Sequence, residues 1–154
     1  GGDGEQYEWT TKNRIYGWKP IGEGHIPSWL DATDSNIYQS EALIKKTQLI
    51  IGTDWEPPMA MAFKMDPLPN IIVFMTDGSA PGDPVSVAKD IASRAKKERI
   101  VINTIALMQP KAAEAMETLA KKTGGVFSLI NENGEKVDPD SIKPAKGAAK
   151  KRKK

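Results

Sequence analysis

The order of apolar segments in the second half of this 154-residue chain constrains its fold more than any other feature. The run IIVFM at residues 71–75 has no polar residue, and a short run of this kind is typical of a parallel strand buried on both faces. Downstream, β-branched segments alternate with segments whose apolar residues recur at helical spacing. We expect, in order, a helix at 83–97, a strand at 100–107, a helix at 110–122 and a strand at 126–130. This alternation predicts an α/β fold, a Rossmann-like parallel sheet flanked by helices, with right-handed crossovers.

Two further helices are predicted upstream of the apolar run. Residues 36–49 place three apolar side chains on one side, and Asn36 with Gln39 resembles a capping box. A second helix begins after Thr53, which can act as its N-cap, and two prolines fall in the first turn, where proline is tolerated. We therefore interpret residues 34–136 as one α/β region.

The two ends of the chain differ from this region in composition. Residues 1–33 are rich in Gly, Trp, Tyr and Pro without a helical or strand period, and we interpret them as an ordered loop or insertion. Their aromatic side chains either pack onto the core or offer a platform to a partner; the candidate partner-binding residues are Trp9, Trp18 and Trp29. Residues 137–154 have too few apolar groups to offset chain ordering and are expected to be disordered. The basic residues of this tail are Lys143, Lys146, Lys150, Lys151, Arg152, Lys153 and Lys154.

Composition and motif searches exclude several classes of site. The chain has no cysteine, which excludes disulfides and thiolate metal sites and leaves the compartment undecided. No apolar stretch approaches the roughly 18 to 20 residues that cross a membrane. The single histidine, His25, lies in a loop with Gly and Pro, and no nucleophile elbow, Walker loop or His-Glu-x-x-His motif is present. We therefore predict a binding module rather than an enzyme.

Two residues stand where a ligand site is expected. Asp77 follows the apolar run directly, and ligands of parallel α/β sheets collect outside the carboxyl ends of the strands. Thr53 lies in a loop that opens a helix and can approach the same edge. A hydroxyl and a carboxylate are oxygen ligands that suit Mg²⁺ or Mn²⁺. Each residue also has a plain structural interpretation, Thr53 as an N-cap and Asp77 as the turn residue of Asp-Gly.

Three segments resemble the second half of von Willebrand factor A domains, in the same order. They are IIVFMTDG at 71–78, IVINTIA at 100–106 and LAKKTGGVF at 119–127, and the upstream Gly52-Thr53-Asp54 resembles the loop that supplies the family's metal-binding Thr. The resemblance implies a metal-ion-dependent adhesion site, which such domains build from an Asp-x-Ser-x-Ser motif, a Thr and an Asp. Carried over to this chain, it assigns Thr53 and Asp77 as ligands of Mg²⁺ or Mn²⁺.

The chain departs from that family at its first strand. No Asp-x-Ser-x-Ser motif occurs in the sequence, and no apolar strand precedes the Trp-rich region to carry one. In the family this strand flanks the one that matches residues 71–75, so its absence leaves an unpaired edge and a bare apolar face. We therefore expect an incomplete domain, whose sheet is completed by another protein or by an upstream segment.

Three functions follow from these observations. The first is a protein-interaction or adhesion module in which the cation at Thr53 and Asp77 completes its shell with a carboxylate of the partner. The second is a processed or split structural subunit that completes a sheet within a larger assembly. The third is binding of nucleic acid or another anionic polymer through the basic tail, with a steep dependence on salt.

Overall fold

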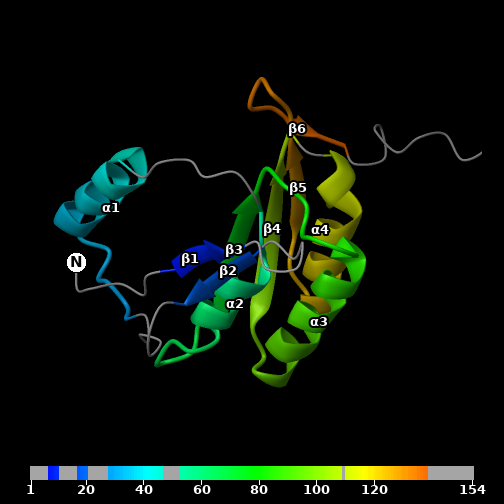
Figure 1. Cartoon of the computed structure of the whole chain (residues 1–154). Helices are drawn as coiled ribbons and strands as arrows, with labels where there is room; N and C mark the ends of the chain where they lie inside the picture. Colours follow the sequence, from blue (N-terminus) through cyan, green and yellow to red (C-terminus); the bar gives the residue numbers. More distant parts are fainter. Residues whose placement is uncertain (1–6, 11–16, 21–27, 47–52, 109, 139–154) are drawn as a thin grey trace, which may run out of the picture.

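The computed structural model describes residues 7–10, 17–20, 28–46, 53–108 and 110–138 (Figure 1). Its strands are β1 (Tyr7–Thr10), β2 (Gly17–Pro20), β3 (Ile71–Thr76), β4 (Val101–Leu107), β5 (Phe127–Ile130) and β6 (Lys136–Val137). Its helices are α1 (Asp34–Lys46), α2 (Glu56–Ala62), α3 (Pro84–Lys97) and α4 (Pro110–Thr123). None of these helices is both long and apolar enough to cross a membrane.

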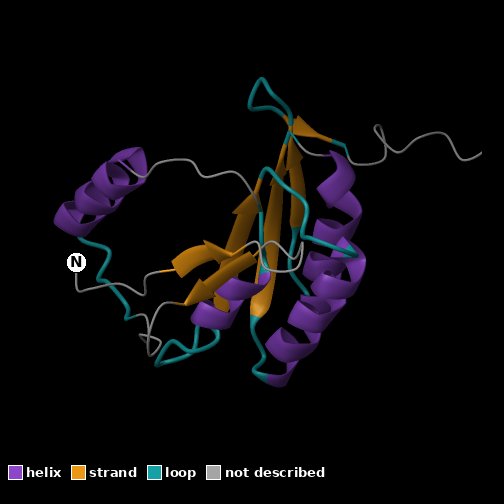
Figure 2. Cartoon of the chain, viewed as in Figure 1, coloured by secondary structure: helices purple, strands orange, loops and turns teal. Residues whose placement is uncertain are grey.

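A four-stranded sheet in the order β3-β4-β5-β6 forms the centre of the fold. β3, β4 and β5 are parallel, and the short β6 pairs antiparallel with β5. Helices α3 and α4 connect the parallel strands and pack against each other along the sheet (Figures 1 and 2). The predicted α/β class, Rossmann-like with a parallel sheet and flanking helices, is confirmed at this level.

Local signals explain why the helices begin and end where they do. The Asp83 side chain accepts a hydrogen bond from the Val85 N–H at 3.1 Å, and Pro84 occupies the first helical position of α3. After α4, Gly124 has a φ of 78°, a left-handed conformation that glycine adopts without strain. Gly125 then passes so close to the Ile102 carbonyl that a Cβ atom would collide with it. The Gly-Gly pair therefore ends the helix and lets the chain enter β5.

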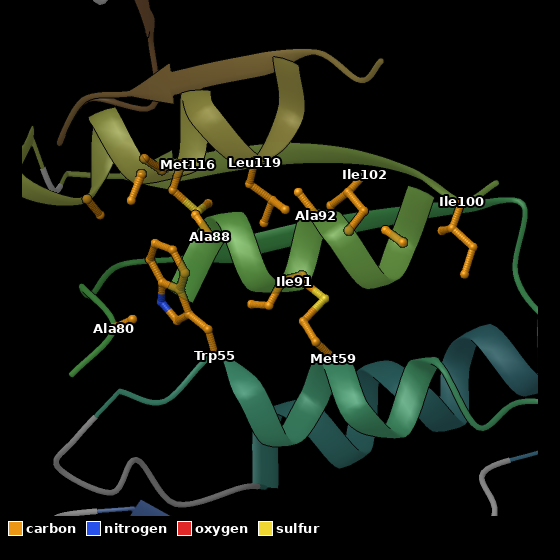
Figure 3. Packing of buried hydrophobic residues seen from close by; sticks show 14 of the residues in the cluster. Trp55, Met59, Ala80, Ala88, Ile91, Ala92, Ile100, Ile102, Met116 and Leu119 are labelled. Atoms are coloured by element: carbon orange, nitrogen blue, oxygen red, sulfur yellow. The ribbon is translucent and has the colours of Figure 1, made fainter. Parts of the chain in front are cut away.

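The core lies between α2, α3, α4 and one face of the sheet. Alternate residues of β4 point into it, and Ile102, Thr104 and Ala106 are all fully buried. Figure 3 shows the buried apolar cluster, in which Trp55 and Met59 from the α2 segment lie near side chains of α3 and α4. The buried Thr104 hydroxyl donates to the Met116 carbonyl at 2.9 Å, which joins the sheet to α4.

The opposite face of β3 is open. Ile71, Val73 and Met75 are 59%, 63% and 57% exposed, whereas Ile72 and Phe74 on the helix side are partly buried. The expectation of a strand buried on both faces was therefore wrong. Within the described residues β3 pairs with β4 alone, so it forms an edge of the sheet. The continuous apolar run indicated burial on both faces because the sequence pattern does not distinguish an edge strand from a central one.

Two predictions for the N-terminal region also need correction. β1 and β2 form an antiparallel pair, with Trp9 opposite Trp18, where we expected a loop. Each strand has only four residues, too few to produce a visible period. The predicted capping box is absent as well: the Asn36 N–H donates to the Thr33 hydroxyl at 3.2 Å, and the Gln39 side chain donates to Ser35.

At the other end, regular structure extends one residue into the predicted tail. Val137 pairs with Leu129 and packs against the core, because β6 covers the outer edge of β5. The basic residues assigned to the tail lie outside the described residues.

Candidate cation site at the carboxyl edge of the sheet

The turn after β3 is held by the last side chain of the strand. The Thr76 hydroxyl accepts from the Gly78 N–H at 3.1 Å and contacts the Gly78 carbonyl at 3.1 Å, where its O–H can donate. These contacts bend the chain directly after the strand. Asp77 is thereby placed at the carboxyl edge of the sheet, and its side chain is exposed.

Thr53 packs against this turn from a different part of the chain. A Cβ atom added to Gly78 would overlap the Thr53 hydroxyl oxygen and would approach the Thr53 Cβ within 2.8 Å. Only a residue without a side chain fits at position 78 while Thr53 keeps its place. The structure therefore brings Thr53 next to the residue that follows Asp77, although 24 positions separate Thr53 from Asp77 in the sequence.

Trp55 fixes the relation between these two segments. Its indole N–H donates to the Gly78 carbonyl at 3.2 Å, and its ring, fully buried, packs edge-to-face on Phe74 of β3 at a centroid distance of 5.5 Å. The loop with Thr53 and the turn with Asp77 are thus joined by a hydrogen bond and by a buried aromatic pair. Trp55 was not among the residues predicted from the sequence. The signal was a lone Trp two residues after the candidate ligand, in a segment that is otherwise aliphatic or polar.

The geometry removes one of the alternative interpretations of Thr53. α2 begins at Glu56, its N-cap residue is Trp55, and that position has no side-chain cap hydrogen bond. The first turn is satisfied instead by Asp54, whose carboxylate accepts from the Glu56 N–H at 3.1 Å. Thr53 therefore does not act as the N-cap of this helix, and its hydroxyl faces the Asp77–Gly78 turn.

Thr53 and Asp77 are ligands of the kind that a hard cation prefers, but two ligands are fewer than such a cation needs. Thr53 and Asp77 offer a hydroxyl and a carboxylate, which are the oxygen ligands that Mg²⁺ and Mn²⁺ prefer. Mg²⁺ takes six ligands, however, and the described residues contain no cluster of three or more His, Cys, Asp or Glu side chains that could hold a metal. These two side chains would therefore supply two of the six ligands, and water or groups from elsewhere would have to supply the other four.

For the aromatic candidates the structure describes other contacts. Trp29 is half-exposed, and its indole N–H donates to the Pro67 carbonyl at 2.7 Å, so it contacts the loop before β3. Trp9 and Trp18 are opposite each other in the β1–β2 pair, and their side chains are outside the described residues. Trp9 and Trp18 thus belong to a strand pair, whereas Trp29 makes a contact with a loop.

Comparison with other proteins adds no assignment. No model of a known protein family matches the chain, and no curated protein matches it either. The resemblance to von Willebrand factor A domains consequently rests on the three segments and the Thr53 loop, and the structure supports it only at the level of an α/β fold.

Proposed function

We propose that the chain is a protein-interaction module of the adhesion type, whose contact point is the turn formed by Thr53, Asp77 and Gly78. In this proposal a divalent cation, Mg²⁺ or Mn²⁺, binds the Thr53 hydroxyl and the Asp77 carboxylate. An acidic side chain of the partner protein then occupies an open coordination position. The observation that carries the proposal is the packing of the Thr53 side chain against Gly78, directly beside Asp77.

The physical basis is the chemistry of a hard cation with few protein ligands. Two oxygen ligands leave most of the coordination shell to water, so the chain alone binds the cation weakly. A carboxylate of the partner replaces one of these waters and adds an opposite charge in direct contact. The affinity of chain and partner then depends on the cation, and the affinity for the cation depends equally on the partner, because linked binding is reciprocal.

Paramagnetic Mn²⁺ tests the cation site without a known partner. Mn²⁺ titrated into the isotope-labelled chain should broaden the amide resonances of Thr53 and Gly78 first, because both lie next to the proposed ligands. Asp77→Asn, which keeps the shape and removes the charge, should abolish this selective broadening. Thr53→Val, which keeps the packing on Gly78 and removes the hydroxyl, should weaken it.

The matched control is Asp90→Asn, a substitution of an exposed carboxylate on α3. It should leave the broadening of Thr53 and Gly78 unchanged. If Mn²⁺ broadens residues around Asp90 and other surface carboxylates as strongly as those at the turn, the cation binds without a defined site and the proposal is wrong.

A further inference from the structure

Besides the Thr53–Asp77 turn, the outer edge of β3 is a place where another strand could bind. β3 pairs with β4 through all six of its residues, from Ile71 opposite Val101 to Thr76 opposite Ala106. On its other side no described strand pairs with it. Edge strands of soluble proteins commonly carry a charge or a proline that prevents further pairing. β3, with the sequence IIVFMT, carries neither.

Both faces of this edge are apolar. On the helix side, Phe74 is only partly buried although it packs against Trp55. On the open side, Ile71, Val73 and Met75 are each more than half exposed. A strand added at this edge would lie beside apolar side chains on both of its faces. The strand that fits is therefore an uninterrupted apolar run, not a segment that alternates apolar and polar residues.

The sequence contains two uninterrupted apolar runs of five residues, and only one of them is a strand in the structure. One run, at 59–63, is the second part of α2 with its C-cap residue Phe63, and the other, at 71–75, is the first five residues of β3. The segments outside the described residues have at most three in a row, LII in 47–52. Of the segments of this chain, β3 of a second copy is the one that meets the requirement.

We propose that two copies of the chain associate through β3, which pairs antiparallel with its own counterpart. The sheets of the two copies then form one continuous sheet, and a two-fold axis perpendicular to it passes through the centre of the new strand pair. A closed two-fold contact of this type limits assembly to a dimer and covers the exposed edge in both copies.

The alternation of side chains determines the register. Because the axis is perpendicular to the sheet, the open faces of the two copies lie on the same side of the continuous sheet. Residues that are directly opposite each other in the new strand pair must therefore point to the same side. The register that pairs all five apolar residues places Val73 opposite Val73 of the other copy. Ile71 is then opposite Met75 on the open face, and Ile72 is opposite Phe74 on the helix side.

Disulfide trapping tests this register directly, because the natural chain has no cysteine. In Val73→Cys the two introduced residues face each other, with Cα atoms about 4.5 to 5.5 Å apart, which is within reach of a disulfide. In Ile71→Cys they are offset by four residues, or about 13 Å along the strand, which is beyond that reach. We expect a covalent dimer of Val73→Cys under mild oxidation and none of Ile71→Cys.

Ile71→Cys is the matched control because the two side chains are almost equally exposed. Random collisions would therefore oxidise both variants to the same extent. Equal cross-linking of the two variants, or no cross-linking of Val73→Cys, overturns the proposed register.

The mass of the native particle tests the dimer itself. Light scattering should give about twice the chain mass of 16.8 kDa for the wild type, and the single mass for Val73→Lys, since the two lysines would face each other across the axis. The control is Ile44→Lys, which places a charge on the exposed side of α1 and should leave the dimer intact.

Three results would contradict the proposal. They are a wild-type monomer at high concentration, a dimer that Ile44→Lys disrupts and Val73→Lys does not, and a particle that contains a different polypeptide paired with β3. None of these measurements depends on a divalent cation. The dimer and the cation site can therefore fail separately.

Discussion

The two faces of the sheet at β3 and β4 both carry apolar residues but have different surroundings. On one face Ile102, Thr104 and Ala106 are completely covered by helices, whereas on the other Ile71, Val73 and Met75 are exposed. The open-face residues are as apolar as those in the core. If β3 were the edge strand of the functional protein, with one face exposed to solvent, we would expect polar residues on that exposed face. Within the described residues, this exposed apolar strand is the feature on which the proposed association of two copies through β3 rests.

Helices α1 and α3 show the same contrast. They have nearly equal lengths, 13 and 14 residues, and both combine apolar and charged residues. α3 buries Ala88, Ile91, Ala92 and Ala95 against the sheet and α4, whereas no residue of α1 is buried. In α3 the small alanines allow close packing of helix on helix and sheet. α1 has larger apolar side chains, among them Ile37, Leu43 and Ile44, and these remain exposed.

The largest effect is expected on the covered face. Leu119 of α4 is fully buried within the core cluster, and Leu119→Ala removes its apolar contacts and leaves a cavity. We expect a loss of about 2 to 5 kcal/mol in the free energy of unfolding, measured by urea denaturation. A loss below about 1 kcal/mol would mean that this face is no better packed than the open one, and the comparison would fail.

A smaller effect is expected at the turn that bears the candidate site. Gly78→Ala introduces a Cβ atom that overlaps Thr53, and because the Thr53 Cβ is also too close, rotation of the hydroxyl cannot relieve the clash. We expect a loss of about 1 to 3 kcal/mol in the free energy of unfolding. Thr53→Gly in the same chain should restore part of it, and a double-mutant cycle measures this coupling. Purely additive losses would show that Thr53 does not pack on Gly78.

The buried hydroxyl of Thr104 tests a polar contact on the covered face. It donates to the Met116 carbonyl in a site with no exposure to solvent. Thr104→Val keeps the shape and removes this hydrogen bond, and we expect a loss of about 0.5 to 1.5 kcal/mol in thermal or urea unfolding. Thr104→Ser, which keeps the hydroxyl and removes a methyl group, separates the hydrogen bond from packing. If Thr104→Val is as stable as the wild type, the contact contributes nothing to stability.

The sequence predicted the elements that local signals define. The cap and proline at Asp83 and Pro84 located α3, and the Gly124-Gly125 pair located the end of α4, because these residues act within a few positions of themselves. The sequence also indicated why Thr53 and Asp77 should lie close together, since loops at the carboxyl ends of parallel strands converge. The structure places the Thr53 side chain against the residue after Asp77.

The features that the sequence did not predict depend on contacts between distant segments. Whether Val73 is buried depends on what lies across the sheet, and the apolar pattern of β3 is the same in either case. The hydrogen bond from Trp55 to Gly78 spans 23 positions and has no local signature. At the start of α1, several residues could have capped the helix, and Thr33 rather than Asn36 does so because of where the chain turns.

The smallest effect is expected on the open face. Ile71→Thr adds a hydroxyl to an exposed, β-branched position in a strand, where threonine is also a good strand former. In dilute solution, where the proposed dimer dissociates, we expect the free energy of unfolding to change by no more than about 0.5 kcal/mol. At high concentration the same substitution weakens the apolar pair between Ile71 and Met75 of the second copy, so a concentration series of melting temperatures should separate variant and wild type progressively. A loss of several kcal/mol at every concentration would mean that residue 71 is covered within the monomer, and the two faces of the sheet would then not differ as described.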